Sequence, residues 1–225
     1  QRFVSHTAEV ILENTFVNGV DNQALKDAQN FVMTSMDVLT DDSETLGLLE
    51  ILSSHADFVY AHSLGVSVYS TLIAKQMGWS SSANLFKLSF GALMHDVGKK
   101  EFPRALLEKP RPLLSYNERV LLESHVFRGK EILEALKSAS SEVIEIAYQH
   151  HENMLGQGFP RQLAGKQIHP MARIVAVADA FCGYALKGPN NPGVPAYKAI
   201  YLMDAYKKDQ LDPEPFKALR AIVKN

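Results

Sequence analysis

The sequence has a single cysteine and almost no net charge, and each shortage excludes a class of protein. Cys182 is the only cysteine among 225 residues, so no disulfide can form within the chain, which suits a reducing compartment. Lysine and arginine number 23 and aspartate and glutamate 25, so no basic field attracts a nucleic acid polymer or a membrane surface. No apolar run approaches the length of a membrane span, and no signal-peptide pattern is present. We therefore expect a cytoplasmic protein.

Strand signals are missing as well, because no stretch combines strand length, period-two alternation and flanking turn residues. Helical periodicity dominates, and apolar residues make up 46% of the chain, enough for a continuous core. A capping box from Ser115 to Glu118 and Pro170 in a first turn mark two helix starts. The predicted helices cover residues 21–40, 57–77, 82–94, 115–136, 140–151, 170–185, 196–208 and 213–223.

Glycine and proline residues divide these helices at four places, namely 78–82, 103–114, 153–168 and 188–195. The sequence thus predicts an all-α domain over residues 53–225. Residues 1–52 carry no motif, and we expect them to form a helical N-terminal extension or part of a second domain.

Histidines and aspartates recur in an order that suggests a metal centre. A carboxylate has two oxygens and can bridge two cations, whereas an imidazole cannot. Five imidazoles and two carboxylates are too many for one tetrahedral zinc, but they suit two six-coordinate transition metals. Nitrogen and oxygen ligands without cysteine favour iron, manganese or zinc. The candidate ligands are His62, His95, Asp96, His125, His150, His151 and Asp179.

Each of these residues also has an ordinary interpretation. His62 lies in an apolar helix and could be a core histidine, His125 could lie on a helix surface, and paired histidines are often solvated. Asp179 follows the apolar run IVAVA, where a buried carboxylate needs a cation or strong hydrogen bonds unless it faces solvent. Three other histidines lack companions, and we expect no functional role for them: His6, His55 and His169.

Taken together, the motifs resemble the HD-GYP family, a branch of the HD-domain metal phosphohydrolases. The resemblance runs from about residue 55 to the C-terminus. It implies a helical bundle with a two- or three-metal centre of iron or manganese in its core, and hydrolysis of the bacterial messenger cyclic di-GMP. The motifs that carry it are His62, His95-Asp96 with Gly98-Lys99, His125 with Gly129, His150-His151-Glu152, Gly156-x-Gly158-x-Pro160 and Asp179.

The resemblance also implies a role for each residue. The first metal would be held by His62, His95, Asp96 and Asp179, and the second by Asp96, His125, His150 and His151, with Asp96 as the bridge. Two metals can lower the pKa of a shared water and hold hydroxide in line with phosphorus. Lys99 would face the phosphate and stabilise its developing charge, although it could also be a solvated lysine beside Lys100. Asp96 and Lys99 are therefore the expected catalytic residues, and iron is the expected metal.

The chain departs from the family at four places. In the substrate loop, Leu155 replaces an aspartate and Phe159 replaces the tyrosine of the GYP motif, leaving Gly156, Gly158 and Phe159 as expected substrate contacts. Phe58 stands where some members place a glutamate that supports a third metal, so we expect two metals. Gly188-Pro189-Asn190 replaces an arginine-proline-tyrosine segment, so no guanidinium is available there to bind a substrate phosphate.

Three functions remain open at the level of sequence. The first is a binuclear phosphodiesterase that acts on cyclic di-GMP or a related nucleotide. The second is a weakly active or inactive signalling module that keeps its metals and binds the nucleotide or a protein with a diguanylate cyclase (GGDEF) domain. The third is an HD-type phosphohydrolase for another phosphoester. A basic segment could attract an anionic ligand or form a solvated face, and it contains Lys100, Arg104, Lys109 and Arg111.

Overall fold

The computed structural model describes residues 58–136 and 139–223, and all regular elements in these two ranges are helical. The predicted all-α fold is confirmed for them, whereas the extension over residues 1–52 and the helix over 21–40 lie outside the described residues. The α-helices are α4 (Phe58–Gln76), α5 (Ser82–Met94), α6 (Arg104–Leu107), α7 (Tyr116–Glu123), α8 (His125–Ala135), α9 (Ser141–Gln149), α10 (Pro170–Ala185), α11 (Ala196–Tyr206) and α12 (Pro213–Val223). Three short 3₁₀ helices join them, η1 (Val97–Glu101), η2 (Arg111–Leu113) and η3 (Gly165–Gln167).

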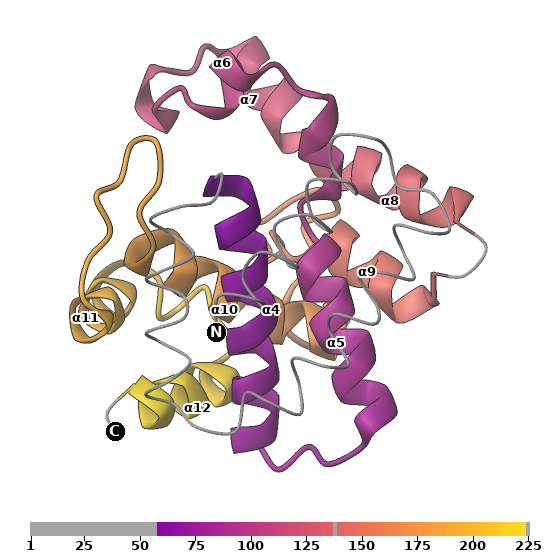
Figure 1. The fold of residues 1–225 in the computed structure, drawn as a ribbon, viewed down its shortest axis with the longest axis vertical. Helices are drawn as coiled ribbons and strands as arrows, with labels where there is room; N and C mark the ends of the chain where they lie inside the picture. Colours follow the sequence, from indigo (N-terminus) through magenta and orange to yellow (C-terminus); the bar gives the residue numbers. More distant parts are fainter. Residues whose placement is uncertain (1–57, 137–138, 224–225) are drawn as a thin grey trace, which may run out of the picture.

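Helix α4 is the centre of the bundle, with α5, α10 and α12 packed around it (Figure 1). Its residues from Ala61 to Thr71 are buried without interruption, as expected for a helix covered on several sides. Tyr69 meets Phe181 of α10 edge to face at 4.6 Å between ring centroids, and Ser67 donates to the carbonyl of Ser89 in α5 at 2.8 Å. Helix α9 packs on α5 and α8 packs on α9, which extends the same core.

The prediction of one continuous helix over residues 115–136 is wrong. The helix is interrupted at Ser124, which separates α7 from α8. The Ser124 hydroxyl donates to the carbonyl of Leu121 at 2.7 Å, and His125 Nδ1 donates to the carbonyl of Leu122 at 2.6 Å. A continuous helix would use these carbonyls for the N–H groups of residues 125 and 126, so the two side chains compete with the backbone. The break places His125 at the first turn of α8.

The segment between α5 and α7 extends away from the core and carries α6 and η2 (Figure 1). We expected residues 103–114 to be non-helical, but Pro103 and Pro110 each precede a short helical turn, since proline presets the backbone entering it. The predicted capping box is confirmed at the start of α7, where Ser115 and Glu118 satisfy each other's backbone N–H groups. The Asn190 side chain donates to the carbonyl of Glu108 at 2.5 Å and so ties this segment to the α10–α11 loop.

Gly98 allows the backbone of η1 to lie directly against the backbone of α8. A Cβ atom at residue 98 would lie 2.0 Å from the carbonyl oxygen of His125 and 2.6 Å from the amide nitrogen of Gly129. No side chain fits at such distances, because both obstacles are backbone atoms of α8. Gly98 therefore fixes η1 against the start of α8, next to Asp96 and His125.

We predict that Gly98→Ala destabilises the fold by about 1–3 kcal/mol or more, because η1 must move off α8. The midpoint of chemical denaturation measures this change. Gly183→Ala in α10 is the matched control, since a Cβ atom there meets no atom of the described residues within 4 Å and alanine favours a helix by about 0.5–1 kcal/mol. A wild-type midpoint for Gly98→Ala would show that the contact between η1 and α8 is not tight.

Candidate metal centre

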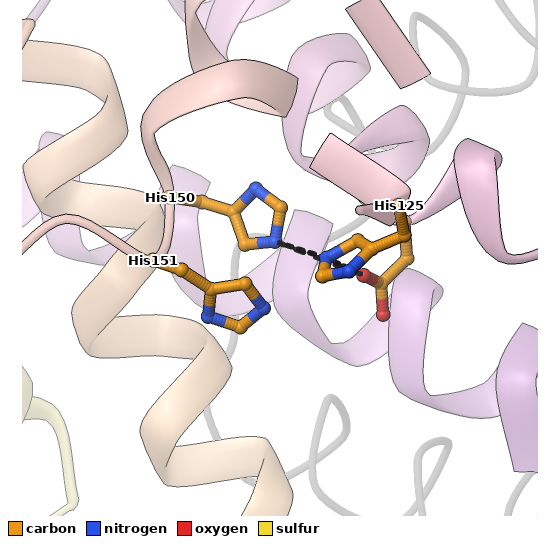
Figure 2. Close-up of side chains that lie close together, drawn as sticks. His125, His150 and His151 are labelled. Carbon is orange, nitrogen blue, oxygen red and sulfur yellow. Dashed lines mark hydrogen bonds and ion pairs between the residues drawn. The ribbon is translucent and has the colours of Figure 1, made fainter. Parts of the chain in front are cut away.

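The structure brings the predicted metal ligands together from five helices. His62 lies in α4, His95 and Asp96 follow the end of α5, and Asp179 lies in the middle of α10. His125 begins α8, while His150 and His151 follow the end of α9 (Figure 2). Two groups have potential ligand atoms within 4.8 Å of one another. One consists of His62, His95 and Asp96, the other of Asp96, His125, His150 and His151.

Asp96 belongs to both groups and is the centre of the arrangement. Its Oδ1 lies 3.3 Å from Nε2 of His125 and 3.7 Å from Nε2 of His150, and its Oδ2 lies 3.3 Å from Nε2 of His95. The residue is 2% exposed. Burial alone would raise the pKa of this carboxyl, but the charges of His95 and Lys99 outweigh it and hold the pKa well below its usual range. Asp96 is therefore a buried carboxylate that needs positive charge on both oxygens.

Three histidines are fixed in the same way by a carbonyl of the preceding helical turn. His95 Nδ1 donates to Ala92 and His125 Nδ1 to Leu122, both at 2.6 Å, and His150 Nδ1 donates to Ala147 at 3.0 Å. A neutral imidazole that donates through Nδ1 keeps a lone pair on Nε2. Each Nε2 faces Asp96, so backbone hydrogen bonds orient these rings as second-sphere groups orient metal ligands.

Burial keeps the histidines of the second group neutral. It lowers the pKa of His125 to about 4 and that of His150 to about 3, and it lowers the pKa of His151 well below the usual value. His95 differs, because the charges of Asp96 and Asp179 outweigh its burial and raise its pKa. Neutral rings at neutral pH are the form in which histidine binds metal.

Unpaired buried atoms test whether a cation fits this cluster. His62 Nδ1, His95 Nε2, Asp96 Oδ1 and His151 Nε2 are all buried, and none has a hydrogen-bond partner among the residues that the structure describes. Nε2 of His125 and Nε2 of His150 also face each other at 3.3 Å, although both rings already donate through Nδ1 (Figure 2). Lone pairs facing each other in a dry site are costly unless a cation accepts them. Imidazole nitrogens around a carboxylate oxygen are suitable ligands for iron, manganese or zinc, so the residues fit a metal.

Asp179 lies at the edge of the cluster. Its Oδ1 accepts a hydrogen bond from His62 Nε2 at 2.9 Å and lies 3.8 Å from His95 Nε2. Burial raises its pKa, but the hydrogen bond and charge of His62 outweigh this effect and leave the pKa below its usual range. Asp179 is outside both compact groups, and its side chain is 22% exposed toward a cleft.

Lys99 was expected to face the phosphate, but in this structure its ammonium donates to Oδ2 of Asp96 at 2.5 Å. It does not line the cleft above the cluster. Lys99 thus supplies on Oδ2 the positive charge that a cation at the first group would supply. The four-carbon side chain can turn away once another cation neutralises that oxygen.

A cleft of about 490 Å³ opens over the second group, with His150, His151 and Asp179 on its floor. The ring of Phe159 lies 4.7 Å from that of His151 and 6.3 Å from that of His125. Of the three predicted substrate contacts, Phe159 and Gly158 line the cleft and Gly156 does not. Gly156 instead forms a turn with φ of 70°. The cleft is also lined by Arg111, Glu123, Asn153, Gln157, Tyr184 and Lys207.

Sequence reasoning missed most of these lining residues. Arg111 appeared as one member of a basic segment, but Glu123, Gln157, Tyr184 and Lys207 carried no signal. They come from elements far apart in the chain, so only the fold places them around one cavity.

Glu152 holds the loop that follows the paired histidines. It is 3% exposed, and its two oxygens accept the backbone N–H groups of Arg161 at 2.6 Å and Leu163 at 2.9 Å. A buried carboxylate is thereby satisfied by backbone donors, and the far end of the loop is fixed beside His151.

Asn153 orders the end of the loop that directly follows the paired histidines. Its Oδ1 accepts the N–H groups of Leu155 and Gln157, each at 3.0 Å. This is an Asx turn, which orders a loop without a charged side chain. The side chain of Leu155, which replaces the family's aspartate, is exposed and cannot form a hydrogen bond, since only the backbone N–H of this residue bonds Asn153. Asn153 and Glu152 thus order the loop without an aspartate at position 155.

The ring of Phe58 fills the space next to Gly188. Two positions at which this chain differs from the expected family pattern are therefore in contact. The ring of Phe58 lies 5.6 Å from that of His62, and a Cβ atom on Gly188 would approach it to 2.7 Å. An arginine at 188 would therefore displace Phe58. An apolar ring also offers no ligand for a further metal.

Comparison with known proteins places this arrangement in a family. A family model described as HD domain matches residues 48–214, well over half of the chain. This chain belongs to the HD domain family. It is 33% identical over 171 residues to the 3'3'-cGAMP-specific phosphodiesterase 3 of Vibrio cholerae, covering 76% of this chain and 36% of that protein. It is 31% identical over 183 residues to a cyclic di-GMP phosphodiesterase of Thermotoga maritima, covering 80% and 49% respectively.

Solved structures share the fold. Bd1817, a HDG"Y"P protein from Bdellovibrio bacteriovorus, matches with a TM-score of 0.77 and 22% identity, covering 99% of this chain and 70% of that one. The HD domain of the phosphodiesterase PgpH from L. monocytogenes, in complex with cyclic-di-AMP, matches with a TM-score of 0.55 and 19% identity, covering 74% and 88%. With the family match and the curated relatives, this confirms the predicted membership of the HD-GYP branch.

The chain corresponds to only part of each curated relative. It spans between about a third and a half of the length of the curated relatives above, so their whole-protein activities do not transfer directly. Within the described ranges 58–136 and 139–223, no helix is both long enough and apolar enough to cross a bilayer.

We predict that Asn153→Ala frees the near end of the loop, because the N–H groups of Leu155 and Gln157 lose their acceptor. Hydrogen exchange at these two amides should become at least about 5-fold faster, corresponding to about 1 kcal/mol of lost hydrogen bonding. Asn153→Asp keeps an acceptor oxygen and serves as the matched control, with exchange close to that of wild type. Equal exchange in all three proteins would show that Asn153 does not order the loop.

Proposed function

We propose that this chain is a metal-dependent phosphodiesterase that hydrolyses a cyclic dinucleotide, with cyclic di-GMP as the proposed substrate. The observation that carries the proposal is the shared carboxylate of Asp96, between two groups of inward-facing histidines and below an open cleft. The names of the curated relatives support it, because they include phosphodiesterases for cyclic di-GMP and for 3'3'-cGAMP. The cleft supports it too, since its volume lies in the range of small-molecule sites.

We propose that His62, His95, Asp96 and Asp179 hold one metal ion and that Asp96, His125, His150 and His151 hold a second. Support comes from the unpaired lone pairs that converge on Asp96 and from the membership of Asp96 in both groups. Asp179 would need a small movement away from His62 to serve as a ligand, because its Oδ1 now accepts the His62 hydrogen bond. We expect iron, with manganese and zinc as alternatives for the same ligand set.

The bound metals would supply Lewis-acid chemistry, activating water and neutralising the phosphodiester oxygens. The residues of the chain perform the remaining tasks. Asp96 holds both halves of the cluster in one geometry, while the carbonyl-bonded histidines keep it rigid. Phe159 packs against His151 and keeps one wall of the cleft apolar, which limits access of bulk water. Lys99, once released from Asp96, would place an ammonium near the developing charge of the phosphate.

A second function, a metal-bound signalling module with little or no turnover, is favoured by one specific observation. Gly188 provides no guanidinium, and Phe58 occupies the space that such a side chain would need. A module of this kind would bind the nucleotide or a protein partner, including a diguanylate cyclase (GGDEF) domain protein. That partner, the third possibility of another phosphoester substrate, and the cytoplasmic location all stay predictions.

Metal counting tests the proposed ligand set. We predict that metal-loaded wild-type protein holds two ions per chain and that Asp96→Ala loses both, because Asp96 belongs to both groups. His62→Ala removes a side chain from the first group alone and should retain one ion. Elemental analysis of the purified proteins measures the ratio.

The control for this count is His169→Ala. The imidazole of His169 accepts the N–H of Met171 at the start of α10 and takes no part in the cluster, so both ions should remain. Full occupancy of one ion in Asp96→Ala would contradict the shared carboxylate.

Turnover of cyclic di-GMP tests the function. We predict that protein loaded with iron or manganese under reducing conditions linearises the nucleotide. The His95→Ala, Asp96→Ala double variant should reduce the rate by more than about a thousandfold, since a metal centre contributes several kcal/mol to the transition state. Chromatography separates substrate and product. Stoichiometric metal with unchanged nucleotide would instead support the signalling module.

A further inference from the structure

Two cationic side chains line the cleft without an acidic partner in the part of the chain that the structure describes. Arg111 enters from η2, and Lys207 enters from the C-terminal end of α11. No ion pair engages either residue within residues 58–136 and 139–223, and the Lys207 ammonium has one weak contact, 3.5 Å from Gln210 Oε1. Lys109, two residues before Arg111, is by contrast paired with Glu118 at 2.7 Å. Unpaired cations beside a cleft are available to an anionic ligand.

Two contacts just before η2 hold the segment that carries Arg111. Lys109 bonds both oxygens of Glu118, the residue that also forms the capping box of α7. The Asn190 side chain donates to the carbonyl of Glu108. Figure 1 shows the α10–α11 loop rising from the bundle to the α6 region. The loop that lacks an arginine at Gly188 therefore positions the segment that carries Arg111.

The acidic groups of the cleft leave room for an anion at these two residues. The Glu152 carboxylate is satisfied by two backbone N–H groups, and Asp179 accepts from His62. Glu123 lines the cleft as well and repels a phosphate on its own side. An anion bound near Arg111 must therefore face away from Glu123.

We propose that Arg111 and Lys207 bind the second phosphate of the cyclic dinucleotide, the one that is not being hydrolysed. A cyclic dinucleotide carries two phosphodiesters on opposite sides of its ring, so one at the metal centre leaves the other for the walls of the cleft. The guanidinium of Arg111 can bond two phosphate oxygens at once, and the Lys207 ammonium adds a second charge. These residues replace the guanidinium that Gly188 lacks. This inference rests on the proposed function and specifies its substrate class.

The test compares two substrates in the metal-loaded chain. Cyclic di-GMP has a second phosphate, whereas bis(p-nitrophenyl) phosphate has one phosphodiester and nothing to reach Arg111 or Lys207. Arg111→Ala and Lys207→Ala should each raise KM for cyclic di-GMP about 10-fold or more, with kcat changed less than about 3-fold, since a charged hydrogen bond is lost. Activity on bis(p-nitrophenyl) phosphate should stay within about 2-fold of wild type. Arg111→Lys should recover part of the loss.

Matched controls separate this role from a general loss of positive charge. Lys208→Ala removes the exposed lysine next to Lys207 that does not line the cleft, and Arg104→Ala removes an exposed arginine of the same segment as Arg111. Both should leave KM unchanged. Asn190→Ala should raise KM for cyclic di-GMP less than Arg111→Ala does. In the Arg111→Ala background it should cause no further increase in KM, because Asn190 acts through Arg111.

The outcomes separate this inference from the proposed function. Wild-type kinetics on cyclic di-GMP in both alanine variants overturn the inference, as does an equal loss on both substrates, which indicates a structural defect. If the wild-type chain hydrolyses neither substrate, the proposed function fails, and the Kd for cyclic di-GMP by calorimetry decides the inference. An increase of about 10-fold in Kd in each variant supports it, whereas no binding by wild type overturns it.

Discussion

The buried carboxylate of Asp96 is the constraint on which the rest of this structure depends. A charge at 2% exposure is expensive, and the fold surrounds it with one ammonium and three imidazole nitrogens from separate elements, an arrangement that suits a shared cation. Each neighbour needs its own local arrangement. Gly98 lets η1 approach α8, the break at Ser124 places His125 in a first turn, and α9 ends where His150 faces inward. The ends of these helices therefore position the side chains of the cluster.

Two residues that differ from the expected family pattern lie next to each other beside the cluster. Phe58 packs beside His62 and leaves no room for a side chain at Gly188. Asn190, in the same loop as Gly188, donates a hydrogen bond to the carbonyl of Glu108 at the end of α6. In the loop after the paired histidines, Asn153 and Glu152 accept backbone hydrogen bonds, and the side chain of Leu155 is exposed.

Much of this arrangement could be predicted from the sequence, for identifiable reasons. Apolar periodicity located α4, α5, α10 and α12 closely, because long amphipathic patterns with glycine or proline at their ends leave few alternatives. The order of the histidines and aspartates indicated which side chains would converge. The break at Ser124 was missed because it depends on side chains capturing carbonyls, which periodicity does not register. Residues such as Lys207 and Tyr184 had no signal, since only tertiary packing brings them to the cleft.

The most direct test of the account is a crystal structure of the metal-loaded chain with anomalous diffraction at the metal edge. We predict two anomalous peaks, each within bonding distance of a different oxygen of Asp96, with Phe58 still packed beside His62 and no third peak near it. A single peak, two peaks that do not share Asp96, or three fully occupied peaks would contradict a binuclear centre built on one buried carboxylate.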